Sequence, residues 1–129
     1  MFKIIPVQDF EYQKQIALSC GRTAKDGYFA YAMTDYETDK PMGFSQFEID
    51  GEYGILADLS SATGLDDFEA MFILGRQTMN FIDKCGAHKC KAYFSTADVK
   101  LLTSIGFKSD DGINYFCDMT NMFDGHCDK

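Results

Sequence analysis

Apolar residues in this sequence gather in short runs that are separated by glycine, proline and aspartate. Runs rich in aromatic and branched side chains are typical of β-strands, and the residues between them mark turns. The Asp50-Gly51 dipeptide is the strongest hairpin signal, because Gly accepts a positive φ. Strands are therefore predicted over residues 2–7, 27–33, 43–49, 53–59, 89–94 and 113–119.

The run over 53–59 predicts a strand whose alternate residues lie on opposite faces of a sheet. Regular alternation predicts that one face consists of Tyr53, Ile55, Ala57 and Leu59. The same alternation predicts that the other face consists of Gly54, Leu56 and Asp58.

Helical periodicity appears in three places. Asp9 is the predicted cap of a helix that continues to about Cys20. The longest helix is predicted over residues 66–85, and the short third helix, over 95–105, begins with a Ser95/Asp98 capping box. Six residues recur at three- and four-residue spacing along one side of the longest helix and are interpreted as core. They are Phe68, Met71, Phe72, Gly75, Met79 and Ile82.

The order of these elements predicts the fold class. An antiparallel hairpin is followed by alternating helices and strands, which is typical of an α/β (α+β) fold with helices on the faces of a mixed sheet. The length of the chain and the lack of a Gly/Ser linker predict a single domain over residues 1–129.

The net charge changes the range of expected partners. Twenty acidic residues against twelve basic ones give −8, and this field repels nucleic acid and anionic membranes. Neither is expected to bind, whereas a small amine or a basic protein patch suits the charge. The N-terminus lacks the pattern of a signal peptide and no apolar run is long enough to cross a bilayer, so a cytoplasmic location is expected.

The segment Cys85-Gly86-Ala87-His88-Lys89-Cys90 is the one cluster of metal-ligand residue types. Structural zinc needs four ligands, and only three are local. His126 and Cys127 in the tail FDGHCDK offer a fourth only if the terminus folds back. Core and turn roles are the preferred interpretation, and no metal is expected; a metal or redox protein remains the third hypothesis for function.

The second half of the sequence resembles the GNAT acetyltransferases. The resemblance rests on FIDKCGAHKCKAYF, where the long helix passes into a strand, and on LLTSIGFKSDDGINYFCDM, where a short helix ends in Gly-Phe before the last hairpin. It covers residues 42–119, and the first forty residues resemble a shortened N-terminal half. The resemblance implies a GNAT-like mixed, mostly antiparallel central sheet with helices on both faces, and acetyl-CoA as a cofactor.

The resemblance also implies where acetyl-CoA binds. Family members hold its diphosphate on backbone N–H groups at the start of the long helix, through a basic, glycine-rich loop. This chain has TGLDDF there, and its acidic residues equally suit the first turn of any helix. The positional candidates for cofactor binding are Leu59, Ser60, Gly64, Leu65, Asp66 and Asp67.

Catalytic groups are sparse by the same comparison. The family's general acid is a Tyr four residues before the Gly of Gly-Phe, and Leu102 occupies that position here. Asp58 and Glu52 are the candidate bases, since a carboxylate before the long helix often has that role in the family. Two leading hypotheses stay open: an acyl-CoA-dependent N-acyltransferase acting on a small amine, and a non-catalytic GNAT-like module that binds a ligand or partner.

The C-terminal segment adds a prediction about assembly. Met119, Met122 and Phe123 are apolar for a chain terminus. Such residues either dock on their own domain or on a second subunit, so a homodimer is one expected outcome.

Overall fold

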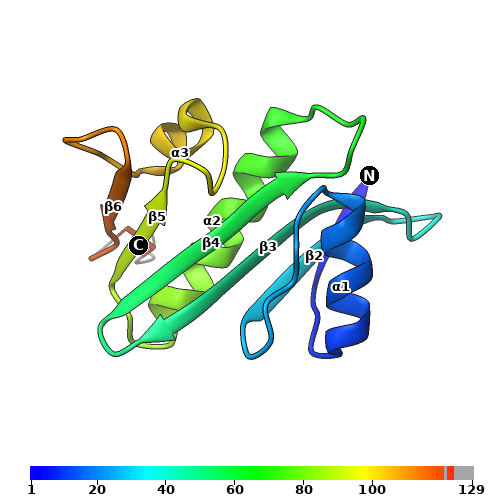
Figure 1. The fold of residues 1–129 in the computed structure, drawn as a ribbon, viewed down its shortest axis with the longest axis horizontal. Coiled ribbons are helices and arrows are strands. Elements are labelled where there is room, and N and C mark those ends of the chain that lie inside the picture. Colours follow the sequence, from blue (N-terminus) through cyan, green and yellow to red (C-terminus); the bar gives the residue numbers. More distant parts are fainter. Residues whose placement is uncertain (121, 124–129) are drawn as a thin grey trace, which may run out of the picture.

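Six strands form one sheet in the computed structural model, which describes residues 1–120, 122 and 123 (Figure 1). Their order across the sheet is the order of the sequence, and of the five strand pairs only β4–β5 is parallel. The predicted α/β class with a mixed, mostly antiparallel sheet is confirmed. The strands are β1 Phe2–Pro6, β2 Phe29–Asp35, β3 Pro41–Asp50, β4 Tyr53–Ser61, β5 Lys89–Tyr93 and β6 Asn114–Asp118. The helices are α1 Phe10–Ser19, α2 Phe68–Lys84 and α3 Val99–Ile105.

The helices cover both faces of the sheet. Figure 1 shows α1 in front of the β2–β3 end, with α2 and α3 behind the sheet. Ile16 and Ala17 of α1 pack with Phe44 in a small core, whereas α2 and α3 bury a larger one that includes Phe47. The amphipathic stripe of α2 predicts this packing, since its buried residues recur at helical spacing.

Aspartate caps all three helices. Asp9 accepts a hydrogen bond from the Glu11 N–H, Asp67 from Ala70 and Asp98 from Lys100. The sequence pattern predicted that the second and third helices begin at residues 66 and 95. The capping residues are Asp67 and Asp98, so α2 and α3 both begin later than predicted. Ser95 lies before α3, in the segment that leads from β5.

A β-bulge at residue 57 corrects the predicted faces of β4. Gln46 pairs with Asp58 and Phe47 pairs with Leu56, so Ala57 is an extra residue without its own partner on β3. Leu56 and Leu59 consequently both enter the core beneath α2. The prediction that Leu59 shares a face with Tyr53, and Asp58 with Leu56, was wrong because it assumed unbroken alternation.

The C-terminal residues that the structure describes lie on the domain itself. Met119 is fully buried, and Met122 and Phe123 pack against the larger core. Their apolar character predicts that they dock either on their own domain or on a second subunit. In the structure they pack on their own domain, and a homodimer stays a prediction. His126 and Cys127 lie outside the described residues. None of the described helices has the length and apolar character needed to cross a membrane.

Close packing at Gly54 gives a test of this arrangement. A Cβ built at Gly54 would lie 2.4 Å from Cγ2 of Ile82 on α2. We expect Gly54→Ala to lower the free energy of unfolding by about 1–3 kcal/mol through overpacking, as measured by urea denaturation. In an Ile82→Ala background the same substitution should cost clearly less. Equal costs in both backgrounds would contradict this contact between β4 and α2.

Candidate functional site

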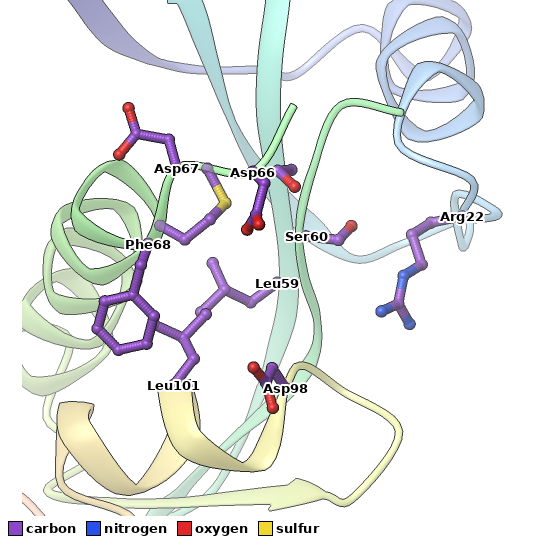
Figure 2. A pocket seen from close by; sticks show the side chains of 10 residues that line it. Arg22, Leu59, Ser60, Asp66, Asp67, Phe68, Asp98 and Leu101 are labelled. Carbon is purple, nitrogen blue, oxygen red and sulfur yellow. The ribbon is translucent and has the colours of Figure 1, made fainter. Parts of the chain in front are cut away.

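A cleft of about 190 Å³ opens where β4, α2 and α3 meet (Figure 2). Its floor is apolar, with Leu59, Met71 and Leu101 below the rim. Figure 2 shows the carboxylates of Asp66 and Asp98 on either side of the Leu59 side chain. The residues that line the cleft are Arg22, Leu59, Ser60, Ser61, Asp66, Asp67, Phe68, Met71, Asp98 and Leu101.

The N-terminus of α2 forms one wall of the cleft and carries negative charge. The Asp67 carboxylate accepts a hydrogen bond from the Ala70 N–H at 3.0 Å. This is the position at which an anionic ligand would meet the free N–H groups and the positive end of the helix dipole. The chain therefore supplies its own anion at this helix end, with the Asp66 carboxylate beside it.

The opposite wall combines a second carboxylate with an unpartnered hydroxyl. Asp98 caps α3 through the Lys100 N–H at 3.3 Å. The Ser60 Oγ atom is buried and has no hydrogen-bond partner among the described residues. In Figure 2 this hydroxyl points to the Arg22 side of the cleft. A bound molecule with a polar group could satisfy it, since buried polar atoms are rarely left unpaired.

The chain's own backbone covers part of the edge of β4. Strands β4 and β5 pair only from Tyr53–Lys89 to Ile55–Lys91 and then separate. Beyond that point the Leu59 N–H donates to the Thr96 carbonyl oxygen at 3.0 Å, and the Thr96 hydroxyl donates to the Leu56 carbonyl oxygen at 3.1 Å. An extended ligand could use these two groups of β4 only by displacing Thr96.

Arg22 links three elements beside the cleft. Its Nη1 atom lies 3.0 Å from Oδ1 of Asp58 on β4 and donates to the Ser95 carbonyl oxygen at 2.8 Å. The other Asp58 oxygen accepts from the Gln46 amide at 2.5 Å. Asp58 is thus nearly buried and held by two partners, an arrangement that fixes the loop before β2 to the sheet.

A second cavity of about 480 Å³ lies on the other side of Arg22. Tyr28, Glu48 and Tyr93 contribute to its lining, and Arg22 lines both cavities. The Tyr28 hydroxyl donates to the Glu48 carboxylate at 2.7 Å, and this bond raises the pKa of Tyr28. The guanidinium of Arg22 therefore separates two compartments on either side of β4.

The structure brings some of the sequence-predicted site residues together and leaves others apart. Leu59, Ser60, Asp66 and Asp67 line the cleft, whereas Gly64 and Leu65 lie in the same loop outside the lining. Asp58 borders the second cavity. Glu52 is exposed in the turn between β3 and β4 and lines neither cavity.

Sequence reasoning missed three residues of this region. Asp98 was recognised only as part of a capping motif, and its place in the cleft depends on how α3 packs. Arg22 and Thr96 carried no signal at all. The contact between Arg22 and Asp58 joins residues 36 apart in the sequence, which no local pattern could have indicated.

The CGAHKC segment has separate local roles. His88 Nδ1 lies 2.6 Å from Oδ1 of Asp83, and Cys90 lies opposite Cys117 across the β5–β6 pair. Burial raises the pKa of the Cys90 thiol to about 12 and that of Cys117 to about 11. Within residues 1–120 plus 122–123, no group of three or more His, Cys, Asp or Glu residues is placed to hold a metal ion.

Comparison with solved structures identifies the fold. The chain is similar to an IAA acetyltransferase from Bacillus cereus, with 12% identity over 91% of this chain and 99% of that one, and a TM-score of 0.72. It is also similar to a Bacillus subtilis acetyltransferase in complex with CoA, with 11% identity over 92% and 99% of the two chains, and a TM-score of 0.70. No family model and no curated protein matches the sequence. The chain has the fold of the GNAT acetyltransferases, as the resemblance predicted.

The residues of the cleft do not fit the diphosphate of the acetyl-CoA that this fold implies. The lining contains three aspartates and one cation, Arg22, among its described residues, and Arg22 is already paired with Asp58. A diphosphate placed at the start of α2 would meet the Asp67 carboxylate, which already occupies the Ala70 N–H and repels a second anion. Charge and hydrogen bonding therefore both oppose the usual mode of binding.

The cap at Asp67 can be tested by stability. We expect Asp67→Ala to lower the free energy of unfolding by about 0.5–2 kcal/mol, because the Ala70 N–H loses its partner. Asp67→Asn should remain close to the wild type, since an amide oxygen also accepts this bond. Denaturant unfolding of both variants checks the assignment, and an Ala variant as stable as the wild type would argue against the cap.

Burial of Cys90 predicts a loss of stability at alkaline pH. Its pKa is raised in the folded chain, so folding favours the thiol, and the stabilisation is lost as the pH rises from about 9 toward 12. Cys90 alone should contribute a loss of about 1 kcal/mol at pH 10. Unfolding free energies at pH 8 and 10 should differ less in Cys90→Ala than in the wild type. The exposed control, Cys85→Ala, should keep the wild-type difference; if all three proteins respond alike, Cys90 is not the cause.

Proposed function

We propose that this chain is a GNAT-like ligand-binding module that does not use acetyl-CoA and whose cleft holds a small molecule with a protonated amine and an apolar body. The observation that carries the proposal is the Asp67 carboxylate on the Ala70 N–H, which places negative charge where an anionic ligand would approach the start of α2. A cation is the complementary ligand for a site that already contains its anion. Its free thiols, of which Cys90 and Cys117 are buried, support a reducing, cytoplasmic location.

The shape and chemistry of the cleft support a small amine. Asp66 and Asp98 provide carboxylates at the rim, and the floor is made of Leu59, Met71 and Leu101. The Ser60 hydroxyl is available to accept or donate one further hydrogen bond. At about 190 Å³ the cleft suits a molecule with one ring or a short aliphatic chain.

A second candidate function is an acyl-CoA-dependent N-acyltransferase. The observation that favours it is the pair of cavities on either side of Arg22, because transfer needs a donor and an acceptor that meet at β4. Many structural neighbours are acetyltransferases, and several were solved with CoA or acetyl-CoA. In this alternative the acceptor is an amine in the second cavity. Asp58 would have to leave Arg22 before it could accept a proton.

Titration calorimetry separates the two candidates. The probes are 2-phenylethylamine, its uncharged analogue 2-phenylethanol, and acetyl-CoA. We expect saturable binding of the amine, binding of the alcohol weaker by about tenfold, and no saturable heat from acetyl-CoA, since each ligand–carboxylate contact contributes on the order of 1 kcal/mol. Saturable binding of acetyl-CoA, followed by release of free CoA thiol with an amine, would favour the acyltransferase.

Charge-neutralising variants locate the binding. Asp66→Asn and Asp98→Asn should each weaken the amine by about fivefold while leaving the alcohol unchanged, because only the charged group meets the carboxylates. Asn can still cap α3, so the fold is preserved in Asp98→Asn. Asp110→Asn, in an exposed turn, is the matched control. Equal affinities for the amine and the alcohol, or equal effects of all three substitutions on amine binding, would contradict the amine proposal.

A further inference from the structure

One face of β4, β5 and β6 carries exposed lysine and aromatic side chains. Lys91 and Phe116 are cross-strand partners, and Phe116 is paired in turn with Lys108. Because directly paired residues share a face, these side chains lie in one row. The lysine–aromatic face, as we name it, consists of Tyr53, Lys91, Tyr93, Lys108 and Phe116.

No described helix covers this face. Helix α1 packs against the β2–β3 end of the sheet, and α2 and α3 lie on the opposite side (Figure 1). Tyr93 is 52% exposed and Phe116 is 41% exposed, although their neighbours Ala92 and Cys117 are buried. The rings of Tyr53 and Phe116 lie 6.2 Å apart, and a hollow of about 260 Å³ lies between Lys91, Tyr93 and Phe116. Exposed aromatic rings beside a hollow are typical of a docking surface.

The lysines of this face have no carboxylate partner among the described residues. The Lys91 ammonium lies 4.3 Å from the centre of the Tyr53 ring, and neither Lys91 nor Lys108 takes part in an ion pair. The strand register also places Glu48 and Asp118 on this side of the sheet, where Glu48 accepts a hydrogen bond from Tyr28 and Asp118 accepts from Thr120. Neither carboxylate forms an ion pair with Lys91 or Lys108, so these two ammonium groups can meet a carboxylate from outside the chain. An acidic protein segment with apolar side chains is the complementary partner.

The chain itself presents such a segment. The segment that we name the acidic loop, residues 65–69, consists of the three residues before α2 and the first two residues of that helix. Its sequence is Leu-Asp-Asp-Phe-Glu, and all five residues are exposed. Leu65 is 45% exposed and Phe68 is 40% exposed, so the loop offers two apolar groups between three carboxylates. Neither Asp66 nor Glu69 has an ion-pair partner among the described residues.

We propose that the lysine–aromatic face binds the acidic loop of a second copy of this chain. Lys91 and Lys108 meet the carboxylates of the loop, while Phe116 and Tyr93 receive Leu65 and Phe68. Every copy carries both surfaces, so a pair related by a two-fold axis uses each of them twice. This assembly goes beyond the proposed amine binding: it shares Asp66 and Phe68 with the cleft, but its test measures self-association without any amine.

Charge exchange between the two surfaces tests the proposal. Sedimentation equilibrium of the wild type over micromolar to submillimolar concentrations should show reversible self-association that is weaker at about 0.5 M than at about 0.05 M salt. The variants K91E/K108E and D66K/E69K should each associate at least about tenfold more weakly, because like charges then meet. An equimolar mixture of the two variants should recover association, because each altered surface again meets its opposite charge.

The control K40E/K84E makes the same change in net charge at exposed lysines outside this face, and it should associate like the wild type. Circular dichroism confirms that each variant is folded. Zero-length carbodiimide crosslinking of mixed light and ¹⁵N-labelled wild type should join Lys91 or Lys108 of one copy to Asp66 or Glu69 of the other. A wild type that stays monomeric throughout, a mixture that does not recover, or crosslinks confined to other surfaces would overturn the proposal.

Discussion

The separation of β4 from β5 after Ile55 is the constraint on which the rest of the site depends. Beyond this point backbone groups of β4 face a gap, and buried backbone groups must find partners. The bulge at Ala57 turns the strand at the same place. Thr96 satisfies the Leu56 carbonyl oxygen and the Leu59 N–H, and so fixes the segment that leads into α3. The position of Asp98, and with it one wall of the cleft, follows from these two hydrogen bonds.

Charge then decides what the cleft can hold. A helix N-terminus attracts one anion strongly, and here the Asp67 carboxylate is that anion. Asp66 and Asp98 add further negative charge, while the Arg22 guanidinium is directed to Asp58 and Ser95 on the other side of β4. The electrostatics of the site therefore contrast with the fold around it, which is shared with enzymes that act on acetyl groups. A shared fold fixes where a pocket forms, and the side chains fix what enters it.

The sequence predicted those features that depend on local patterns. The Asp50-Gly51 hairpin, the stripe of α2 and the order of the later elements are encoded within short windows, and each appears in the structure. The bulge at Ala57 could not be predicted, because alanine has no preference for such a position. Arg22 escaped notice for a different reason, since its partners Asp58 and Ser95 are brought to it only by the assembled sheet.

Stability and ligand binding compete for the same hydrogen bonds in this cleft. A site that receives an extended ligand along β4 and an anion at α2 must leave the Leu59 N–H and the Ala70 N–H free in the unbound chain, which costs stability. Here Thr96 and Asp67 occupy both groups, so these two N–H groups are already satisfied in the unbound chain. A ligand of that kind would have to break these hydrogen bonds. Its anionic group would also be repelled by the Asp67 carboxylate. A ligand that leaves them intact, and uses only the carboxylates and the Ser60 hydroxyl, meets no such opposition.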